Sequence, residues 1–348
     1  MAAVRLCALV RHFDRQVVRA ATAIPPGTIA PVTATTPADP APEPFYADRA
    51  ALKRNFGRAA ATFAQGDALH REIASRMLER LGYIKATPAR VLDLGSATGA
   101  ALPGLRERYP QAQLLALDLA RPMLKLAAGA AAPAQGAGWA ARLAGSMLRK
   151  PAAVPAVQAD MARLPFKSGA LDLIWSNLAL HWLDDPAPAI REAQRALGVG
   201  GLFMFSTLGP DTLLELRAAF AAAGDRAGWH VKRFIDLHDI GDALVGAGFT
   251  TPVMDMEKIT LTYETLDGLF ADLRNSGSVN AMLGRPRGLL GRQRLARLRA
   301  AYEAWRRDGR LPATFEVIYG HAWKGQPRRT AAGEAIVSFV PGRSRPQG

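Results

Sequence analysis

Short apolar segments alternate with amphipathic ones through the middle of the chain. The apolar runs occupy residues 90–94, 113–117, 154–157, 171–175 and 202–206, and turn-forming residues bound them. Runs of this length are typical of buried strands, and helical spacing between them indicates crossover connections. The pattern therefore predicts an α/β fold, a doubly wound and mostly parallel sheet with helices on both faces.

The regions that flank this alternation have other periods. Residues 45–85 repeat apolar side chains such as Met77 and Leu81 at helical spacing, which predicts a helical cap. Residues 253–263 and 315–323 alternate apolar and polar positions, which predicts two antiparallel strands. This C-terminal hairpin-like pair would complete a seven-stranded, Rossmann-like sheet.

Composition divides the chain further. Residues 1–44 begin with scattered arginines and continue rich in Pro, Ala and Thr, so we expect a disordered or targeting extension. The core spans 86–263, with an Ala/Gly/Pro-rich insertion near 127–153. Helical spacing returns at 264–310, which predicts a lid for substrate or partner. Residues 311–348 then hold the final strand and a disordered tail.

Polar residues mark the expected helix starts. Asp185 followed by Pro186 predicts a capped N-terminus. Thr212 and Glu215 have the spacing of a capping box, and Asp236 is expected to cap a further helix.

Charge and cysteine content limit the partners and the compartment. The formal net charge of +14 favours nucleic acid, an anionic membrane surface or an acidic protein, or else a generally basic surface. Cys7 is the only cysteine, which excludes a disulfide framework and a cysteine-based metal site and is typical of the cytoplasm. A mitochondrial location stays open if residues 1–21 are a transit peptide, as does a start codon further downstream. No apolar run approaches the roughly 20 residues of a membrane span, and the scattered histidines predict no metal site.

The strongest candidate site follows the first predicted strand. The sequence VLDLGSATG at 91–99 leads a strand into a turn where Gly95 and Gly99 allow close backbone approach. The N–H groups at the start of the next helix can bind a carboxylate or a phosphate. Asp118 ends the second strand, where a carboxylate can accept both hydroxyls of a ribose. These features predict a nucleoside cofactor, either a nicotinamide dinucleotide or S-adenosylmethionine.

Three features favour S-adenosylmethionine. The turn lacks the third glycine of the dinucleotide pattern. Asp160 and Met161 follow the third strand, where an acid can accept the adenine amino group and an apolar side chain can cover the ring. Asn177 follows the fourth strand, beside the expected reaction centre. The residues expected to bind the cofactor are Asp93, Gly95, Ser96, Ala97, Gly99, Asp118, Leu119, Asp160, Met161 and Asn177.

These motifs resemble class I S-adenosylmethionine-dependent methyltransferases. The resemblance rests on residues 92–99, Asp118, the sequence DMARLPF at 160–166, Asp172 and the glycine pair at 200–201. The usual turn of that family, GCGTG, stands here as GSATG. Ala97 therefore replaces the central glycine and leaves less room for a close backbone approach.

Other segments narrow the resemblance to the malonyl-acyl-carrier-protein O-methyltransferases of biotin synthesis, over about residues 50–325. These segments are NFGRAA at 55–60, SNLALHW at 176–182, FSTLGPDTLLELR at 205–217, DLR at 272–274 and LPATFEV at 311–317.

The resemblance implies methylation of the free carboxylate of malonyl-loaded acyl carrier protein, with S-adenosylmethionine as the methyl donor. This reaction starts the pimeloyl moiety of biotin. Because the carboxylate is already ionised, positioning and desolvation should carry the acceleration. Arg274 is expected to hold the free carboxylate. Asn177 and His181 are the other catalytic candidates, although a cleft-lining role suits His181 better, since the acceptor has no proton to lose.

The carrier protein is acidic, and the segment Arg285–Arg310 is expected to dock it. Arginines there outnumber Glu303 and Asp308; they are Arg285, Arg287, Arg292, Arg294, Arg297, Arg299, Arg306, Arg307 and Arg310. A solvated basic helix or an RNA-binding face would give the same pattern.

Three rival functions stay open. The first is a complex I assembly-type methyltransferase that acts on a protein arginine, and the second is a non-catalytic S-adenosylmethionine-binding scaffold. The third is an RNA methyltransferase, which charge alone suggests, although no nucleic-acid or membrane partner is expected. The sequence leaves the oligomeric state open.

Overall fold

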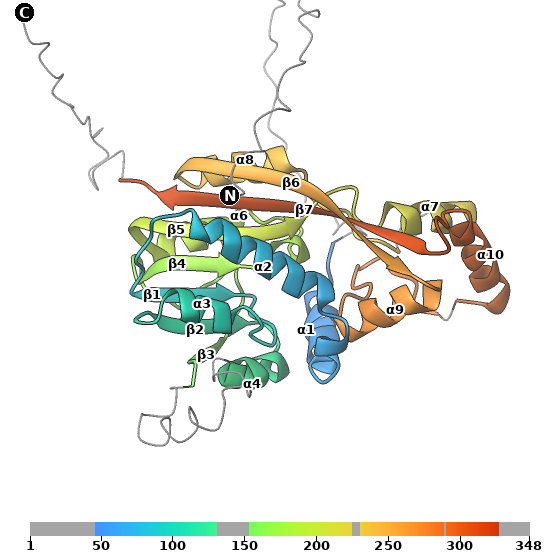
Figure 1. Ribbon diagram of the computed structural model, residues 1–348, viewed down its shortest axis with the longest axis horizontal. Helices are drawn as coiled ribbons and strands as arrows, with labels where there is room; N and C mark the ends of the chain where they lie inside the picture. The colour runs from blue at the N-terminus through green and yellow to red at the C-terminus, as the bar shows by residue number, and fades with distance from the viewer. Residues whose placement is uncertain (1–45, 131–152, 225–229, 289, 327–348) are drawn as a thin grey trace, which may run out of the picture. The chain divides into compact units, whose positions relative to one another are not determined.

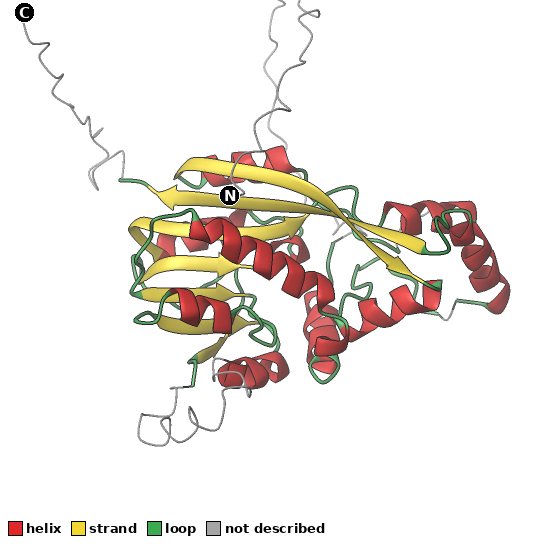
Figure 2. Cartoon of the chain, viewed as in Figure 1, coloured by secondary structure: helices red, strands yellow, loops and turns green. Residues whose placement is uncertain are grey.

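The seven strands form one mixed sheet in the order β3-β2-β1-β4-β5-β7-β6 (Figures 1 and 2). The computed structural model describes residues 46–130, 153–224, 230–288 and 290–326. The strands are β1 (Arg90–Leu94), β2 (Gln113–Asp118), β3 (Ala156–Gln158), β4 (Leu171–Ser176), β5 (Leu197–Leu208), β6 (Phe249–Tyr263) and β7 (Leu311–Lys324). Strands β1 to β5 pair in parallel, whereas β7 runs antiparallel to both β5 and β6. The predicted sheet is confirmed.

The two antiparallel strands are longer than the alternation predicts, and no tight turn joins them. Helices α9 (Leu266–Asn275) and α10 (Arg292–Glu303) lie between them in the sequence. Strand β7 then returns to a position between β5 and β6. The pair is therefore antiparallel without being a local hairpin, and its connection supplies two helices at one end of the sheet (Figure 1).

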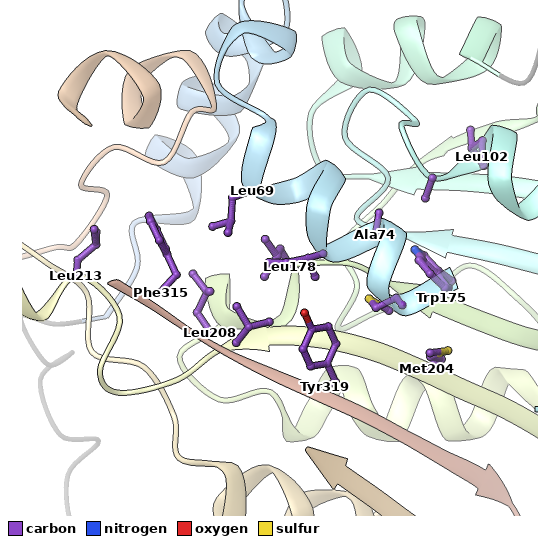
Figure 3. Close-up of a cluster of buried hydrophobic side chains, with 14 of the residues drawn as sticks. Leu69, Ala74, Leu102, Trp175, Leu178, Met204, Leu208, Leu213, Phe315 and Tyr319 are labelled. Carbon is purple, nitrogen blue, oxygen red and sulfur yellow. The ribbon is translucent and has the colours of Figure 1, made fainter. Parts of the chain in front are cut away.

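Helices cover both faces of the sheet because successive strand residues point to opposite sides. On one face, Leu173 and Trp175 of β4 pack with Met77 of α2 (Ala68–Gly82) and with α3 (Leu102–Arg108) (Figure 3). On the other face, Ile174 packs with Ile190 of α6 (Ala187–Ala196) and with α8 (Leu237–Gly246). Each fully buried large apolar side chain stabilises the fold by roughly 1.5–3 kcal/mol.

The remaining helices surround the carboxyl ends of the parallel strands. They are α1 (Arg49–Ala59), the short 3₁₀ turn η1 (Phe63–Gln65), α4 (Arg121–Ala130), the 3₁₀ turn η2 (Leu180–Trp182) and α7 (Leu214–Ala222). Helix α4 continues through residues 127–130, where the insertion was expected to begin. The rest of that insertion lies outside the described residues, as do the extension at 1–45 and the tail at 327–348.

The predicted helix caps have different outcomes. Asp185 accepts the N–H of Ala187 at 2.8 Å beside the start of α6, and Asp236 caps α8. The prediction of a capping box at Thr212 and Glu215 is wrong, because α7 starts only after Leu213. Buried Glu215 instead accepts the N–H of Thr314 at 3.0 Å, and Thr212 bonds to β7 as well. Both side chains therefore hold β7 rather than the helix start.

Candidate active site

A cavity of about 100 Å³ lies at the carboxyl ends of β1, β2 and β4, and we call it the turn cavity. Nearly all the residues predicted to bind the cofactor line it; they are Asp93, Gly95, Ser96, Ala97, Asp118, Leu119, Asp160, Met161 and Asn177. Gly99 does not line it, because it packs the turn against α4. Helix α1 contributes Arg49, Leu52 and Phe56 to the opposite wall.

The backbone of the turn requires glycine at two positions. Gly95 has a φ of +76°, and a Cβ there would lie 2.4 Å from the Cβ of Ala179. Gly99 has a φ of +80°, and its Cβ would lie 2.9 Å from the Cα of Ala127. The N–H of Gly95 also donates to the carbonyl of Leu117 at 2.8 Å, which fixes the turn to β2. The turn therefore has one shape that larger residues at these positions would disrupt.

Ala97 takes a glycine-like conformation in the middle of this turn. Its φ is +45°, a left-handed conformation that costs an L-residue roughly 1–2 kcal/mol. Its N–H donates to Asp118 Oδ2 at 2.9 Å, and its side chain packs beside Phe63 and Met123. The chain thus keeps the expected turn although alanine replaces the family's central glycine.

Two carboxylates dominate the electrostatics of the turn cavity. Asp118 accepts the N–H groups of Ala97 and Ala120 at 2.9 and 2.8 Å, which orients both of its oxygens. Asp93 is only 3% exposed, and its Oδ2 accepts no hydrogen bond within the described part of the chain. Burial, together with the charge of Asp118, raises the pKa of Asp93 to about 7. Buried Ser96 Oγ likewise lacks a partner among these residues.

These groups fit S-adenosylmethionine, the cofactor that the resemblance implies. Buried polar atoms normally have hydrogen-bond partners, so two orphaned ones on residues that line a cavity favour a polar ligand there. Gly95 packs against Ala179 at the edge of this cavity, and the apolar side chains of Phe56 and Met161 also border the space. Asp160 also lines the cavity, where it forms an ion pair with Arg49 of α1 and accepts the N–H of Ala162; its contact with adenine stays a prediction.

Asn177 has both ends of its side chain occupied. Its Nδ2 donates to the carbonyl of His70 at 2.9 Å, and its Oδ1 accepts the hydroxyl of Ser206 at 2.8 Å. The next residue, Leu178, is buried with a φ of +48°, and its N–H donates to Ser206 Oγ at 3.0 Å. Asn177 therefore links α2 to β5 and fixes the strained backbone between them.

A second cavity, of about 420 Å³, adjoins the turn cavity, and we call it the large cavity. Most of its wall is apolar; Leu69, Leu178, Leu208, Leu213 and Phe315 of this wall appear in Figure 3. Four residues, Leu52, His70, Leu178 and Trp182, line both cavities. The two spaces are therefore neighbours that share one wall.

Two of the three predicted catalytic residues lie at the large cavity. Arg274 is exposed at the end of α9 and lines it, and within the described residues its guanidinium forms no ion pair or hydrogen bond. His181 is 7% exposed, and its Nδ1 has no hydrogen-bond partner there. Burial lowers the pKa of His181 well below its usual value, with smaller contributions from Lys232 and His70. His181 is therefore a neutral imidazole.

Sequence reasoning missed His70 and Lys232. Burial lowers the pKa of His70 to about 4, so this residue of the shared wall is also neutral. Its position three residues before Ile73 on the apolar stripe of α2 is the one signal that could have found it. Lys232 Nζ donates to Asp184 Oδ1 at 2.9 Å beside the large cavity, and nothing in the local sequence marks it.

The described residues contain no cluster of His, Cys, Asp or Glu that could hold a metal ion. None of the described helices is both long and apolar enough to cross a membrane.

Known proteins resemble the chain in sequence. A family model described as "Methyltransferase domain" matches residues 92–205, which include the part of the turn-cavity lining from Asp93 to Leu183. The malonyl-[acyl-carrier protein] O-methyltransferase of Laribacter hongkongensis is 50% identical over 302 residues, which are 86% of this chain and 98% of that protein. The protein of the same name from Gallionella capsiferriformans is 47% identical over 293 residues, or 84% and 97%.

A solved structure also resembles the chain. It is Haemonchus contortus phosphoethanolamine N-methyltransferase 2 in complex with S-adenosyl-L-methionine, with 16% identity and a TM-score of 0.42. The match covers 73% of this chain and 52% of that one.

Proposed function

The chain belongs to the malonyl-[acyl-carrier protein] O-methyltransferase family, and from that membership we propose that it methylates the free carboxylate of malonyl-acyl carrier protein. The observation that carries the proposal is the wall shared by the two cavities. A methyl donor in the turn cavity and an acceptor in the large cavity would meet where the two cavities adjoin, beside Leu178 and His70. Such an arrangement suits direct transfer between two bound molecules.

The residues of the turn cavity would hold the cofactor. S-adenosylmethionine, when bound, supplies the methyl group of its sulfonium. Asp118, oriented by two backbone N–H groups, would accept hydrogen bonds from a ribose. Asp93 and Ser96 offer buried polar atoms that have no partner within the described chain. Gly95 lines the same cavity and lets the turn pack closely against Ala179.

The residues of the large cavity would position the acceptor without removing a proton. A malonyl carboxylate is ionised at neutral pH, so no general base is needed. The apolar wall excludes water, which strengthens any charge interaction inside the cavity. Arg274 is the proposed cation for the carboxylate because its guanidinium is not engaged by an acid of the described chain. Neutral His70 and His181 can each donate one hydrogen bond to the acceptor.

The acidic carrier protein is the proposed partner, and Arg285–Arg310 is a candidate docking surface. Several arginines of this segment form ion pairs with acidic side chains, in the pairs Arg285–Asp48, Arg299–Asp267, Arg306–Glu303 and Arg310–Glu264. Arg287, Arg292 and Arg297 are exposed and form no ion pair with the described residues. These three remain the part of the segment best able to attract a carrier protein.

The proposal is tested with S-adenosylmethionine labelled in its methyl group. We expect label on malonyl-carrier protein as an alkali-labile ester, and on malonyl-pantetheine, which has the same acceptor without the protein. RNA and a protein with accessible arginines serve as comparators. Label on arginine or RNA alone would overturn the assignment of the acceptor. Binding of the cofactor without transfer to any acceptor would instead identify a scaffold.

A further inference from the structure

Helices α1 and α4 carry basic side chains and no acidic residue. Helix α1 has Arg49, Lys53, Arg54 and Arg58, and α4 has Arg121 and Lys125. Arg49 is held by Asp160 at the turn cavity. The other five are exposed, and we call them the α1–α4 basic surface: Lys53, Arg54, Arg58, Arg121 and Lys125.

The two helices meet where these side chains are concentrated. A Cβ on Gly57 would lie 3.7 Å from Cγ of Pro122, so α1 and α4 are in direct contact there. Arg58 and Arg121 are the sequence neighbours of these two contact residues. Positions four apart lie on the same side of a helix, so Arg54 joins Arg58 on α1 and Lys125 joins Arg121 on α4. The positive charges therefore form one surface across both helices.

No interaction within the described chain accounts for this concentration of charge. Lys53, Arg58, Arg121 and Lys125 form no ion pair or side-chain hydrogen bond with the described residues. Arg54 lies near Asp48, which Arg285 already holds at 2.9 Å. Like charges four residues apart destabilise a helix, and net self-repulsion destabilises the compact state. The surface thus opposes folding, as a surface kept for an anionic partner would.

Part of the α1–α4 basic surface lies on a helix that also lines both cavities. Leu52 of α1 lines both cavities, Phe56 lines the turn cavity, and Ala47 just before the helix lines the large cavity. Helix α1 therefore lies between the basic surface and both reactant spaces. Figure 1 shows α1 between α4 and α9, whereas α10 packs against α7 at the far end of β7. Residues of α1 line both cavities themselves, whereas no residue of α10 lines either of them.

We infer that the α1–α4 basic surface is the main docking site for the acidic carrier protein. The inference rests on the proposed function for the identity of the partner. A small acidic protein whose acyl group hangs on a phosphate-bearing arm matches a positive surface one helix away from the cavities. Such complementarity chiefly raises the rate of association, and salt weakens it.

The test compares two matched charge reversals in the full chain. One variant combines Arg58→Glu with Lys125→Glu, and the other combines Arg292→Glu with Arg297→Glu on α10. At low salt we expect the first to raise the KM for malonyl-carrier protein about tenfold or more, with weaker salt dependence. The second should change this KM less than twofold. Neither should alter the rate with malonyl-pantetheine, which makes no contact with a docking surface.

The outcomes separate docking from chemistry. An unchanged KM in the α1–α4 variant, or a larger effect in the α10 variant, would overturn the inference and favour the Arg285–Arg310 segment. If the reversal on α1 and α4 unfolds the protein, Arg58→Gln with Lys125→Gln replaces it, with a smaller increase in KM expected. Fluorescence anisotropy of labelled carrier protein measures docking even if wild-type protein methylates neither acceptor, a result that would contradict the proposed function alone.

Discussion

The turn cavity and the large cavity share a wall but are built in different ways. The turn cavity comes mainly from chain segments that directly follow β1, β2 and β4, so its polar groups have fixed positions relative to the sheet. The large cavity combines α1, α2, α9, β7 and the loop before α8, and most of its wall is apolar. Under the proposed function, the sheet would determine how the methyl donor is held, whereas the added helices would determine what receives the methyl group.

The largest effect should follow from breaking the turn. Gly95→Ala places a Cβ 2.4 Å from that of Ala179 and a side chain at a φ of +76°. We expect the affinity for S-adenosylmethionine to fall by about two orders of magnitude or more, since the turn must shift to relieve the clash. Titration calorimetry measures this. Gly129→Ala is the matched control, because no atom lies within 4 Å of its added Cβ; near-wild-type affinity in Gly95→Ala would refute the assignment of the turn.

The next effect separates the large cavity from the turn cavity. Arg274→Ala should raise the KM for malonyl-pantetheine roughly ten- to a hundredfold, the worth of a charge-assisted hydrogen bond of about 1.5–3 kcal/mol. The dissociation constant for S-adenosylmethionine should stay unchanged. Arg191→Ala, at an exposed arginine of α6, is the control. Equal losses in the affinity for donor and acceptor would show that Arg274 supports the fold rather than the acceptor.

A smaller effect is expected from pH, and it concerns the turn cavity alone. The pKa of Asp93 is raised to about 7 because the carboxylate is buried near Asp118. A cationic ligand binds the ionised form better, so affinity for S-adenosylmethionine should rise about tenfold from about pH 6 to about pH 8. The gain is lost as pH falls through this pKa. Asp93→Asn should bind more weakly and show a flat profile over this range; a flat profile in the wild-type protein would contradict the assignment.

The smallest effect concerns Ala97. Ala97→Gly relieves a left-handed φ of +45°, which stabilises, but it removes a methyl group packed beside Phe63. Relief of the left-handed φ should stabilise the fold by roughly 1–2 kcal/mol, and loss of the packed methyl group should destabilise it by about 0.8 kcal/mol. The free energy of unfolding should therefore change by no more than about 1 kcal/mol. Cofactor affinity should stay within about twofold. Binding that is ten times tighter would mean that the alanine obstructs the cofactor.

The difference between the cavities also explains what could be predicted from the sequence. Asp93, Gly95 and Asp118 lie where a strand becomes a turn, and local patterns reveal such positions. The short apolar runs predicted the sheet, although β6 and β7 are longer than the sequence pattern predicted. Lys232 could not be found in this way, because only tertiary packing brings the loop before α8 to the large cavity, and the apolar stripe of α2 marks His70 only as a buried position. The capping box predicted at Thr212 and Glu215 failed for the same reason, since both side chains accept hydrogen bonds from β7.

A crystal structure with S-adenosylhomocysteine and malonyl-pantetheine tests the central claim most directly. The account predicts the nucleoside in the turn cavity beside Asp118, with the thioether sulfur where the two cavities adjoin, beside His70 and Leu178. The malonyl group should lie in the large cavity, with a carboxylate oxygen facing that sulfur and with Arg274 in contact. A nucleoside bound elsewhere, or a malonyl group outside the large cavity, would contradict the claim that these two spaces form one active site.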